Sequence, residues 1–277
     1  MSLSFRWLGV AGVELRADDQ VLAIDPFFTR PSLKGLVQPV RSDANLVAEK
    51  MPSCDYILVT HSHWDHLLDV PELMRQTNAR AYGSANTCQL LRLHGVPESS
   101  INEMKVGERI SLGIFNVEVI TGQHSRIPFG WIFNGSLKPG LHPPLRLQDY
   151  RMDVCLGYCI TVMGMRVLVC AAQPQPAETL FVVAQESERY YLSLFKEVLP
   201  HTIVPIHWDN FLRPLSKPLR RFTRPGRMSV RRLTGLAHDV LPEVNVIIPE
   251  IFRKYLLVEM GEKGMKMAYR QRMDDGR

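Results

Sequence analysis

The segment HSHWDH at positions 61–66 constrains this chain more than any other feature, because it places three imidazoles and one carboxylate within six residues. It follows directly on the apolar run Tyr56–Thr60, which is typical of a buried strand. Neutral imidazole nitrogens and carboxylate oxygens are ligands that zinc and related divalent metals take in proteins. The pattern predicts a metal site in a loop that leaves a rigid, buried strand.

Two further histidines stand at the ends of predicted strands. His124 follows the predicted strand Phe115–Thr121 after two residues, and His207 follows the predicted strand Thr202–Ile206 directly. Strands that each end in a histidine indicate one rim of a sheet where the side chains converge. A catalytic zinc takes three protein ligands and keeps one position open. We therefore expect both histidines to join the cluster at 61–66.

The composition is that of an ordinary globular protein, with 45% apolar and 22% charged residues in a chain of 277. No apolar stretch approaches the ~20 residues that span a membrane, and the first residues lack the pattern of a signal peptide. The five cysteines are odd in number and widely spread, which favours free thiols packed in the core. We expect a cytoplasmic protein without a transmembrane segment.

Strands and helices run through the chain without a dividing linker. We therefore expect one domain over residues 1–265 and a frayed polar tail over 266–277. Among the helices, the pattern predicts Leu67–Gln76 and Ala177–Ala184. Residues 126–153 carry four prolines, several aromatic residues and no regular pattern, which is typical of a lid or a substrate loop.

The positive charge of the chain is concentrated in one stretch. Arg213–Arg232 holds eight basic residues and no acidic residue, whereas the net charge of the whole chain is only +5. Its three prolines prevent a continuous helix through most of the stretch. Two interpretations stay open: a surface loop that attracts anions, and a solvated loop without a specific ligand.

The segment at 61–66 resembles the signature His-x-His-x-Asp-His of the metallo-β-lactamase superfamily. Within that superfamily the chain looks most like the lactonase and N-acyl phosphatidylethanolamine phospholipase D-like branch. The matching stretches are WLGVAGVEL, AIDPFF, THSHWDH, VITGQHS and VPIHWDNF, so the resemblance runs from about residue 3 to about residue 258. It implies an α/β fold, a four-layer αββα sandwich with the metal site at one edge between two sheets.

The resemblance also implies which residues bind metal. One site would take His61, His63 and His124, and a second site would take Asp65, His66 and His207. Asp25, before a proline, resembles the aspartate that supports a ligand histidine from behind in this family. Zinc is the metal that we expect first, with manganese and iron as alternatives.

One position departs from the family pattern. The family usually has an aspartate that bridges both metals after the strand before the last histidine, and this chain has Ala-Ala-Gln at 171–173 instead. Two divalent ions ~3.5 Å apart repel each other by roughly 19 kcal/mol at an effective dielectric constant of ~20. We therefore expect one tightly bound ion. A second ion would need another ligand, for which the candidates are Gln173, Asp209, Asp149 and Asp153.

These residues predict a metal-dependent hydrolase in which a metal-activated water attacks an ester, a lactone or a phosphodiester. Asp65 would orient this water and take its proton, whether or not it also binds the metal. In the 126–153 loop, Arg126, Phe129 and Trp131 offer a cation and two aromatic rings as substrate contacts. That mixture suits a small or lipid-like substrate with an apolar portion and an anionic group.

Two alternatives come from other functional classes. The first is a metal-dependent nuclease, because the same superfamily includes such enzymes and Arg213–Arg232 is basic. Against it, this stretch has one aromatic residue, Phe222, where surfaces that stack on bases use several. The second is a catalytically impaired binding relative that has lost the bridging carboxylate. We expect no nucleic-acid partner, leave peripheral contact with a membrane open, and find no feature that indicates an oligomeric state.

Overall fold

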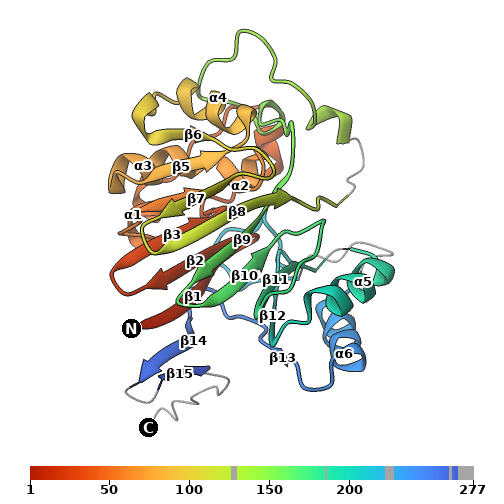
Figure 1. The fold of residues 1–277 in the computed structure, drawn as a ribbon. Helices are drawn as coiled ribbons and strands as arrows, with labels where there is room; N and C mark the ends of the chain where they lie inside the picture. The colour runs from red at the N-terminus through yellow and green to blue at the C-terminus, as the bar shows by residue number, and fades with distance from the viewer. Residues whose placement is uncertain (126–129, 185, 222–227, 262–263, 268–277) are drawn as a thin grey trace.

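The computed structural model describes residues 1–125, 130–184, 186–221, 228–261 and 264–267. Two β-sheets face each other in the middle of the molecule, and helices lie against the outer side of each sheet (Figure 1). This arrangement is the four-layer αββα sandwich that the sequence leads us to expect, and the prediction of the fold class is confirmed.

The first sheet has eight strands in the order β15-β14-β1-β2-β3-β4-β5-β6. Its neighbours are antiparallel from β15 to β3 and parallel from β3 to β6. The strands are β1 (Ser2–Gly9), β2 (Gly12–Ala17), β3 (Gln20–Ile24), β4 (Tyr56–Leu58), β5 (Arg80–Gly83), β6 (Ile101–Glu103), β14 (Lys254–Gly261) and β15 (Gly264–Met267).

The second sheet has seven strands in the order β13-β12-β11-β10-β9-β8-β7. Its neighbours are antiparallel from β7 to β10 and parallel from β10 to β13. The strands are β7 (Arg109–Leu112), β8 (Phe115–Thr121), β9 (Leu156–Val162), β10 (Met165–Val169), β11 (Thr179–Val183), β12 (Thr202–Ile206) and β13 (Asn245–Val246).

Helices connect the parallel strands of both sheets. Serine begins three of them, because the Ser84, Ser187 and Ser229 side chains each accept a hydrogen bond from a backbone N–H in the first turn. The helices are α1 (Ala44–Lys50), α2 (Trp64–Leu67), α3 (Val70–Thr77), α4 (Ala85–Leu93), α5 (Glu188–Val198) and α6 (Val230–Val240), with short 3₁₀ turns η1 (Leu33–Leu36), η2 (Glu98–Ser100), η3 (Gly130–Ile132) and η4 (Leu147–Asp149).

Three apolar cores lie between the four layers. The core between the sheets includes Phe5 of β1 and Phe181 of β11, whose rings meet edge to face at 5.1 Å between centroids. Leu73 and its neighbours bury α1–α4 against the first sheet, and Phe195 and its neighbours bury α5 and α6 against the second. Where helices cover it, each sheet is therefore apolar on both faces, whereas β7 and the first half of β8 alternate between buried and more exposed residues.

The predicted helix at Ala177–Ala184 is wrong, because this segment forms strand β11. Its residues Thr-Leu-Phe-Val-Val lie between the parallel neighbours β10 and β12, and four of the five are buried. A parallel strand that is buried on both faces is a continuous apolar run, and such a run lacks the alternation that identifies a half-exposed strand.

The predicted helix at Leu67–Gln76 divides into α2 and α3. The first of these begins at Trp64, inside the ligand segment, so it holds Asp65 and His66 in one rigid turn. Between the two helices lies Asp69, which is completely buried and whose carboxylate accepts hydrogen bonds from the backbone N–H groups of Phe28 and Thr29. These bonds fix the segment after β3 against the ligand turn.

The chain ends and the predicted lid show two further differences. Residues 266 and 267, expected to fray, belong to β15, and residues 268–277 lie outside the described part of the chain. From residue 130 to residue 153 the segment predicted as a lid contains the short turns η3 and η4 and a β-bridge between Asn134 and Met152. Over the described ranges, no helix has the length and apolar character needed to cross a membrane.

Candidate metal centre

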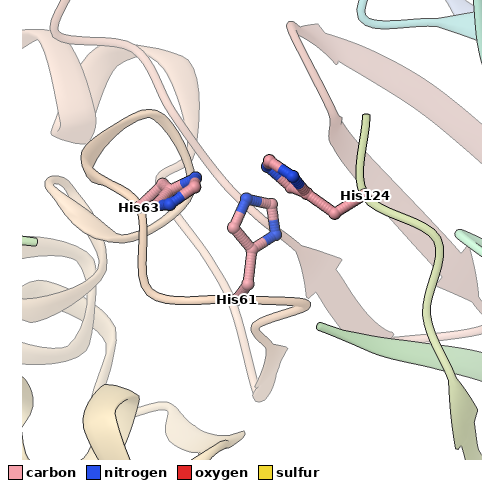
Figure 2. Close-up of side chains that lie close together, drawn as sticks. All are labelled: His61, His63 and His124. Carbon is pink, nitrogen blue, oxygen red and sulfur yellow. The ribbon is translucent and has the colours of Figure 1, made fainter. Parts of the chain in front are cut away.

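Three imidazoles converge from two loops at the edge of the sheets. His61 and His63 lie in the loop after β4, and His124 lies after β8. One ligand nitrogen of each ring lies within 4.8 Å of those of the other two. The ring centroids are 4.6 to 4.9 Å apart, and Figure 2 shows the three rings turned toward one another. This set is called the first ligand group below.

A second ligand group consists of Asp65, His66 and His207, again with ligand atoms within 4.8 Å of one another. An Asp65 carboxylate oxygen, Oδ2, lies 3.5 Å from His207 Nε2 and 3.9 Å from His66 Nε2. The two groups adjoin, because the ring centroids of His61 and His66 are only 3.8 Å apart. All six residues that the sequence singles out as ligands therefore meet in one place.

Hydrogen bonds indicate which nitrogen of His61 and which nitrogen of His63 faces the centre. The Nε2 atom of His63 lies 3.1 Å from the Phe133 carbonyl oxygen, which leaves its Nδ1 atom to act as a ligand. In His61 the Nδ1 atom lies 3.0 Å from Thr60 Oγ1 instead. Its Nε2 atom is buried and has no hydrogen-bond partner among the described residues. A buried nitrogen left unpaired between two further imidazoles fits a bound divalent ion.

Asp25 supports the second group from behind, as the sequence predicts. Its Oδ2 atom lies 2.8 Å from His66 Nδ1 and accepts a hydrogen bond from Thr60 Oγ1 at 2.5 Å. Its Oδ1 atom accepts the Thr60 backbone N–H at 2.7 Å. A carboxylate in this position fixes the tautomer and orientation of the imidazole, and it increases the basicity of the opposite nitrogen.

The pKa values differ between the two groups. Burial, assisted by neighbouring imidazoles, holds the pKa of His61 well below its ordinary value and lowers that of His124 to about 3. Burial opposes protonation of His66 too, but the charges of Asp25 and Asp65 outweigh it and raise the pKa of His66 to about 9. Burial would raise the pKa of Asp65, yet His66 and His207 hold it well below its usual range. Asp65 is therefore an ionised carboxylate at neutral pH.

Three side chains enter the site from residues with left-handed backbone. Asp25 follows β3, Cys170 follows β10 and His207 follows β12, with φ values of 46°, 55° and 57°. Non-glycine residues rarely adopt this conformation, and they keep it only where the surrounding structure enforces it. The turn at the strand end redirects each side chain from the sheet toward the ligand groups.

Cys170 is a site residue that sequence reasoning missed. Together with the ligand histidines it lines the cavity described below, and its Sγ atom lies 3.8 Å from that of Cys155. Cys155 Sγ is in turn 4.0 Å from His61 Nδ1. The available signal was its position directly after β10, which matches the position of His207 after β12.

The structure corrects the candidates for an additional ligand. The Asp209 carboxylate is fully buried and engaged elsewhere, because it pairs with Arg30 at 2.6 Å and accepts the Val10 backbone N–H at 2.9 Å. Gln173 is exposed and does not line the cavity. The Asp153 carboxylate accepts hydrogen bonds at the start of α4, and that of Asp149 accepts one within its own 3₁₀ turn. None of these side chains belongs to either ligand group.

The predicted substrate residues have different outcomes. Arg126 and Phe129 lie outside the described residues. The Trp131 side chain is 74% exposed and is not part of the cavity lining, whereas Phe133, two residues later, does line it. Among the described lid residues, Phe133 therefore contributes an aromatic wall to the cavity.

A cavity of about 280 Å³ opens above the two ligand groups. Its floor contains the histidines and Asp65, and its sides come from segments far apart in the sequence. Leu33 and Leu36 line it from η1, and Leu147 lines it from η4. A water molecule and a small substrate group can therefore reach the ligand atoms from solvent.

Comparison with known proteins identifies the family. Residues 21–168, more than half of the chain, match a family model described as the beta-lactamase superfamily domain. The chain belongs to the beta-lactamase superfamily. It is also 26% identical over 227 residues to a UPF0173 metal-dependent hydrolase of Staphylococcus aureus, a match that covers 76% of this chain and 87% of the relative.

Solved structures of other proteins have the same fold. A metallo hydrolase from Ignicoccus hospitalis, Igni18, superposes with a TM-score of 0.62 at 16% identity, covering 92% of this chain and 98% of that one. The metallo-beta-lactamase fold protein YhfI from Bacillus subtilis gives a TM-score of 0.57 at 13% identity, covering 92% of this chain and all of the other. The four-layer architecture is thus shared at sequence identities too low to carry a substrate across.

Proposed function

We propose that this protein, a metal-dependent hydrolase of the beta-lactamase superfamily, cleaves an ester, lactone or phosphodiester bond with water at the two ligand groups. The observation that carries the proposal is the His61 Nε2 atom, which is buried and unpaired among the described residues. It faces the ring of His63 and the ring of His124. Leaving such an atom without a partner costs free energy that binding of a cation would recover.

The residues that would hold the ion are His61, His63 and His124, with zinc as the first candidate and manganese and iron as alternatives. A divalent ion bound there would lower the pKa of a coordinated water toward ~7. It would also polarise the oxygen of the attacked bond. The second group can hold another ion, but no carboxylate outside Asp65 is part of the ligand groups. One tightly bound ion therefore remains the preferred stoichiometry.

Asp65 is the proposed proton acceptor. Its carboxylate is ionised because His66 and His207 hold its pKa low. It is also fixed in position by the α2 turn and lies between the imidazoles of the second group. A carboxylate in that position orients an attacking water and takes its proton as the water adds to the substrate.

The substrate is proposed to be a small anionic or lipid-like molecule, with Arg126, Phe129 and Trp131 among its contacts. Trp131 is exposed and lies two residues from the cavity-lining Phe133. This exposure supports a contact between Trp131 and a part of the substrate that extends into solvent. A cytoplasmic location belongs to the same proposal, and the five free thiols support a reducing compartment.

The test combines metal analysis with a substrate screen. Protein purified without chelators is expected to carry about one tightly bound divalent ion per chain, located by anomalous scattering at the first ligand group. A panel of esters, lactones and phosphodiesters should then show turnover that a chelator abolishes and added metal restores. Full metal occupancy without turnover of any member of the panel would instead support the binding relative.

A further inference from the structure

The cavity above the metal centre has apolar walls. Beside the two leucines of η1, the walls include Phe133, Leu147, Phe211 and Leu212. Apart from the histidines, the ionisable side chains among its described lining residues are Asp25, Asp65 and Cys170, and no lysine or arginine is among them. An anionic substituent that entered would lose its hydration at apolar walls that carry no lysine or arginine among their described residues.

The walls are held in place by packing against the ligand loops. The Phe211 ring lies 5.5 Å from the Trp64 ring and 6.0 Å from that of His207, measured between centroids. Phe133 contacts His63 in the same way at 6.2 Å. The position of each ring is therefore coupled to a residue of the ligand segment or to a ligand itself.

Two buried contacts fix the remaining walls. Arg30, just before η1, pairs with Asp209 at 2.6 Å, and it donates hydrogen bonds to the carbonyl oxygens of Asn210 and Arg213. The η1 segment and the segment after β12 are thereby joined across the cavity. On the other side, a Cβ atom at Gly35 would come within 3.0 Å of Leu147, so η1 and η4 pack closely. An apolar pocket built this way is formed before a ligand arrives.

We propose that the cavity takes an uncharged, apolar substituent next to the scissile group, such as an aliphatic chain or an aryl ring. This inference rests on the proposed function and chooses between its two substrate classes. The lipid-like class fits the walls, because burial of apolar surface is the interaction that they offer. An anionic group remote from the scissile bond does not fit, because the described walls offer it no partner.

The first test compares two 4-nitrophenyl esters on the metal-loaded protein. The hexanoate has an apolar chain, and the mono-ester of adipic acid has a chain of equal length that ends in a carboxylate. We expect kcat/KM for the hexanoate to be higher by at least about 10-fold, as for other discriminations in apolar pockets. Equal values, or a preference for the charged ester, would overturn the proposal.

A pair of matched variants shows whether the cavity wall sets this preference. Leu33 lines the mouth of the cavity and is 63% exposed, so Leu33→Lys places a cation at the wall with little effect on folding. It should shift the ratio of the two kcat/KM values toward the charged ester by about 10-fold. Val37→Lys is the control, because Val37 is 71% exposed near η1 and lies outside the lining. An equal shift in both variants would mean that general surface charge, rather than the wall, decides selectivity.

Binding without metal separates this inference from the proposed function. An uncharged naphthalene dye should bind the metal-free protein more tightly than its sulfonated analogue, and Leu33→Lys should reduce the difference. If no ester is hydrolysed at full metal occupancy but the dyes behave this way, the proposed function fails and the selectivity of the cavity stands. If the sulfonated dye binds equally well or better, the cavity inference is wrong whatever the activity.

Discussion

The two ligand groups lie side by side, yet they carry different charges before any metal arrives. The first group is three imidazoles, all with pKa values below the ordinary one, and it contains no carboxylate. The second group contains the carboxylate of Asp65, and its His66 is hydrogen-bonded to Asp25. The charges of these two carboxylates raise the pKa of His66 to about 9. The first group is therefore neutral at pH 7, whereas His66 carries a proton that a metal must displace.

The two groups therefore differ in how their metal binding depends on pH. Ligand nitrogens must be deprotonated, so a neutral group can bind a cation over a wide pH range. The second group must first release the proton of His66, but its carboxylate then offsets part of the charge of the ion. We expect the first group to fill first and the second to fill only when its proton is lost.

Removal of a ligand from the neutral first group should affect metal binding most. His124→Ala leaves two imidazoles where a catalytic zinc takes three protein ligands. Metal content after purification and turnover should both fall by more than the ~10–100-fold typical of losing a supporting residue. Plasma mass spectrometry and steady-state kinetics measure the two quantities. His238→Ala, on the exposed side of α6, is the control and should retain both. Retention of full metal by His124→Ala would exclude this residue as a ligand.

The next test acts on the charged group alone. Asp65→Asn preserves the size of the side chain but removes the proton acceptor, so kcat should fall by ~10²–10⁴-fold. The first ion should still be present at one per chain, because His61, His63 and His124 are unchanged. Parallel measurement of kcat and of metal content checks both statements. A variant with unchanged kcat would rule out the proton-accepting role.

A smaller effect is expected from the residue that supports the second group. Asp25→Asn removes the negative charge behind His66 and should weaken metal binding at the second group by ~10–100-fold. Competition with a coloured chelator resolves the two affinities, and the first group serves as the internal control. Equal weakening at both groups would mean that the substitution disturbs the whole loop rather than one ligand.

The smallest expected effect is a pH dependence that separates the groups. Below pH about 9 the metal-free His66 is protonated, so affinity at the second group should fall about tenfold for each unit of pH below that value. Affinity at the first group should be almost independent of pH between 6 and 9, because its imidazoles are already neutral. Calorimetry in buffers of different ionisation enthalpy should show about one proton released on filling the second group only. In Asp25→Asn, metal affinity at the second group should stop increasing with pH at a lower pH than in the unmodified protein. The reason is that the Asp25 charge, which helps to raise the pKa of His66, is gone.

The six ligand residues could be predicted from the sequence because strand ends converge. An apolar run followed by histidine identifies both a strand and its end. The ends of β4 in one sheet and of β8 and β12 in the other meet at the ligand groups. Asp25 was predicted from the family resemblance, and in the structure it follows β3, which pairs with β4. The four-layer fold followed from the family resemblance, and the two sheets with three cores agree with it.

Other features depend on contacts that sequence spacing does not encode. Asp209 lies two positions after His207 and was therefore a candidate ligand. Its carboxylate instead pairs with Arg30, which is 179 residues away in the chain. Cys170 reads as a core thiol, because the left-handed turn that brings it to the cavity has no local signature. The apolar walls come from four separate segments, and only their assembly in space shows that they surround one cavity.

The left-handed residues after β3, β10 and β12 have a consequence for how the protein could evolve. Each costs of order 1–3 kcal/mol of conformational free energy, while the net stability of a domain is only ~5–15 kcal/mol. Glycine at these positions would relieve the strain and favour folding, but it would delete the side chains that face the centre. Selection for thermal stability alone would therefore tend to replace them, so activity and robustness compete at these three positions.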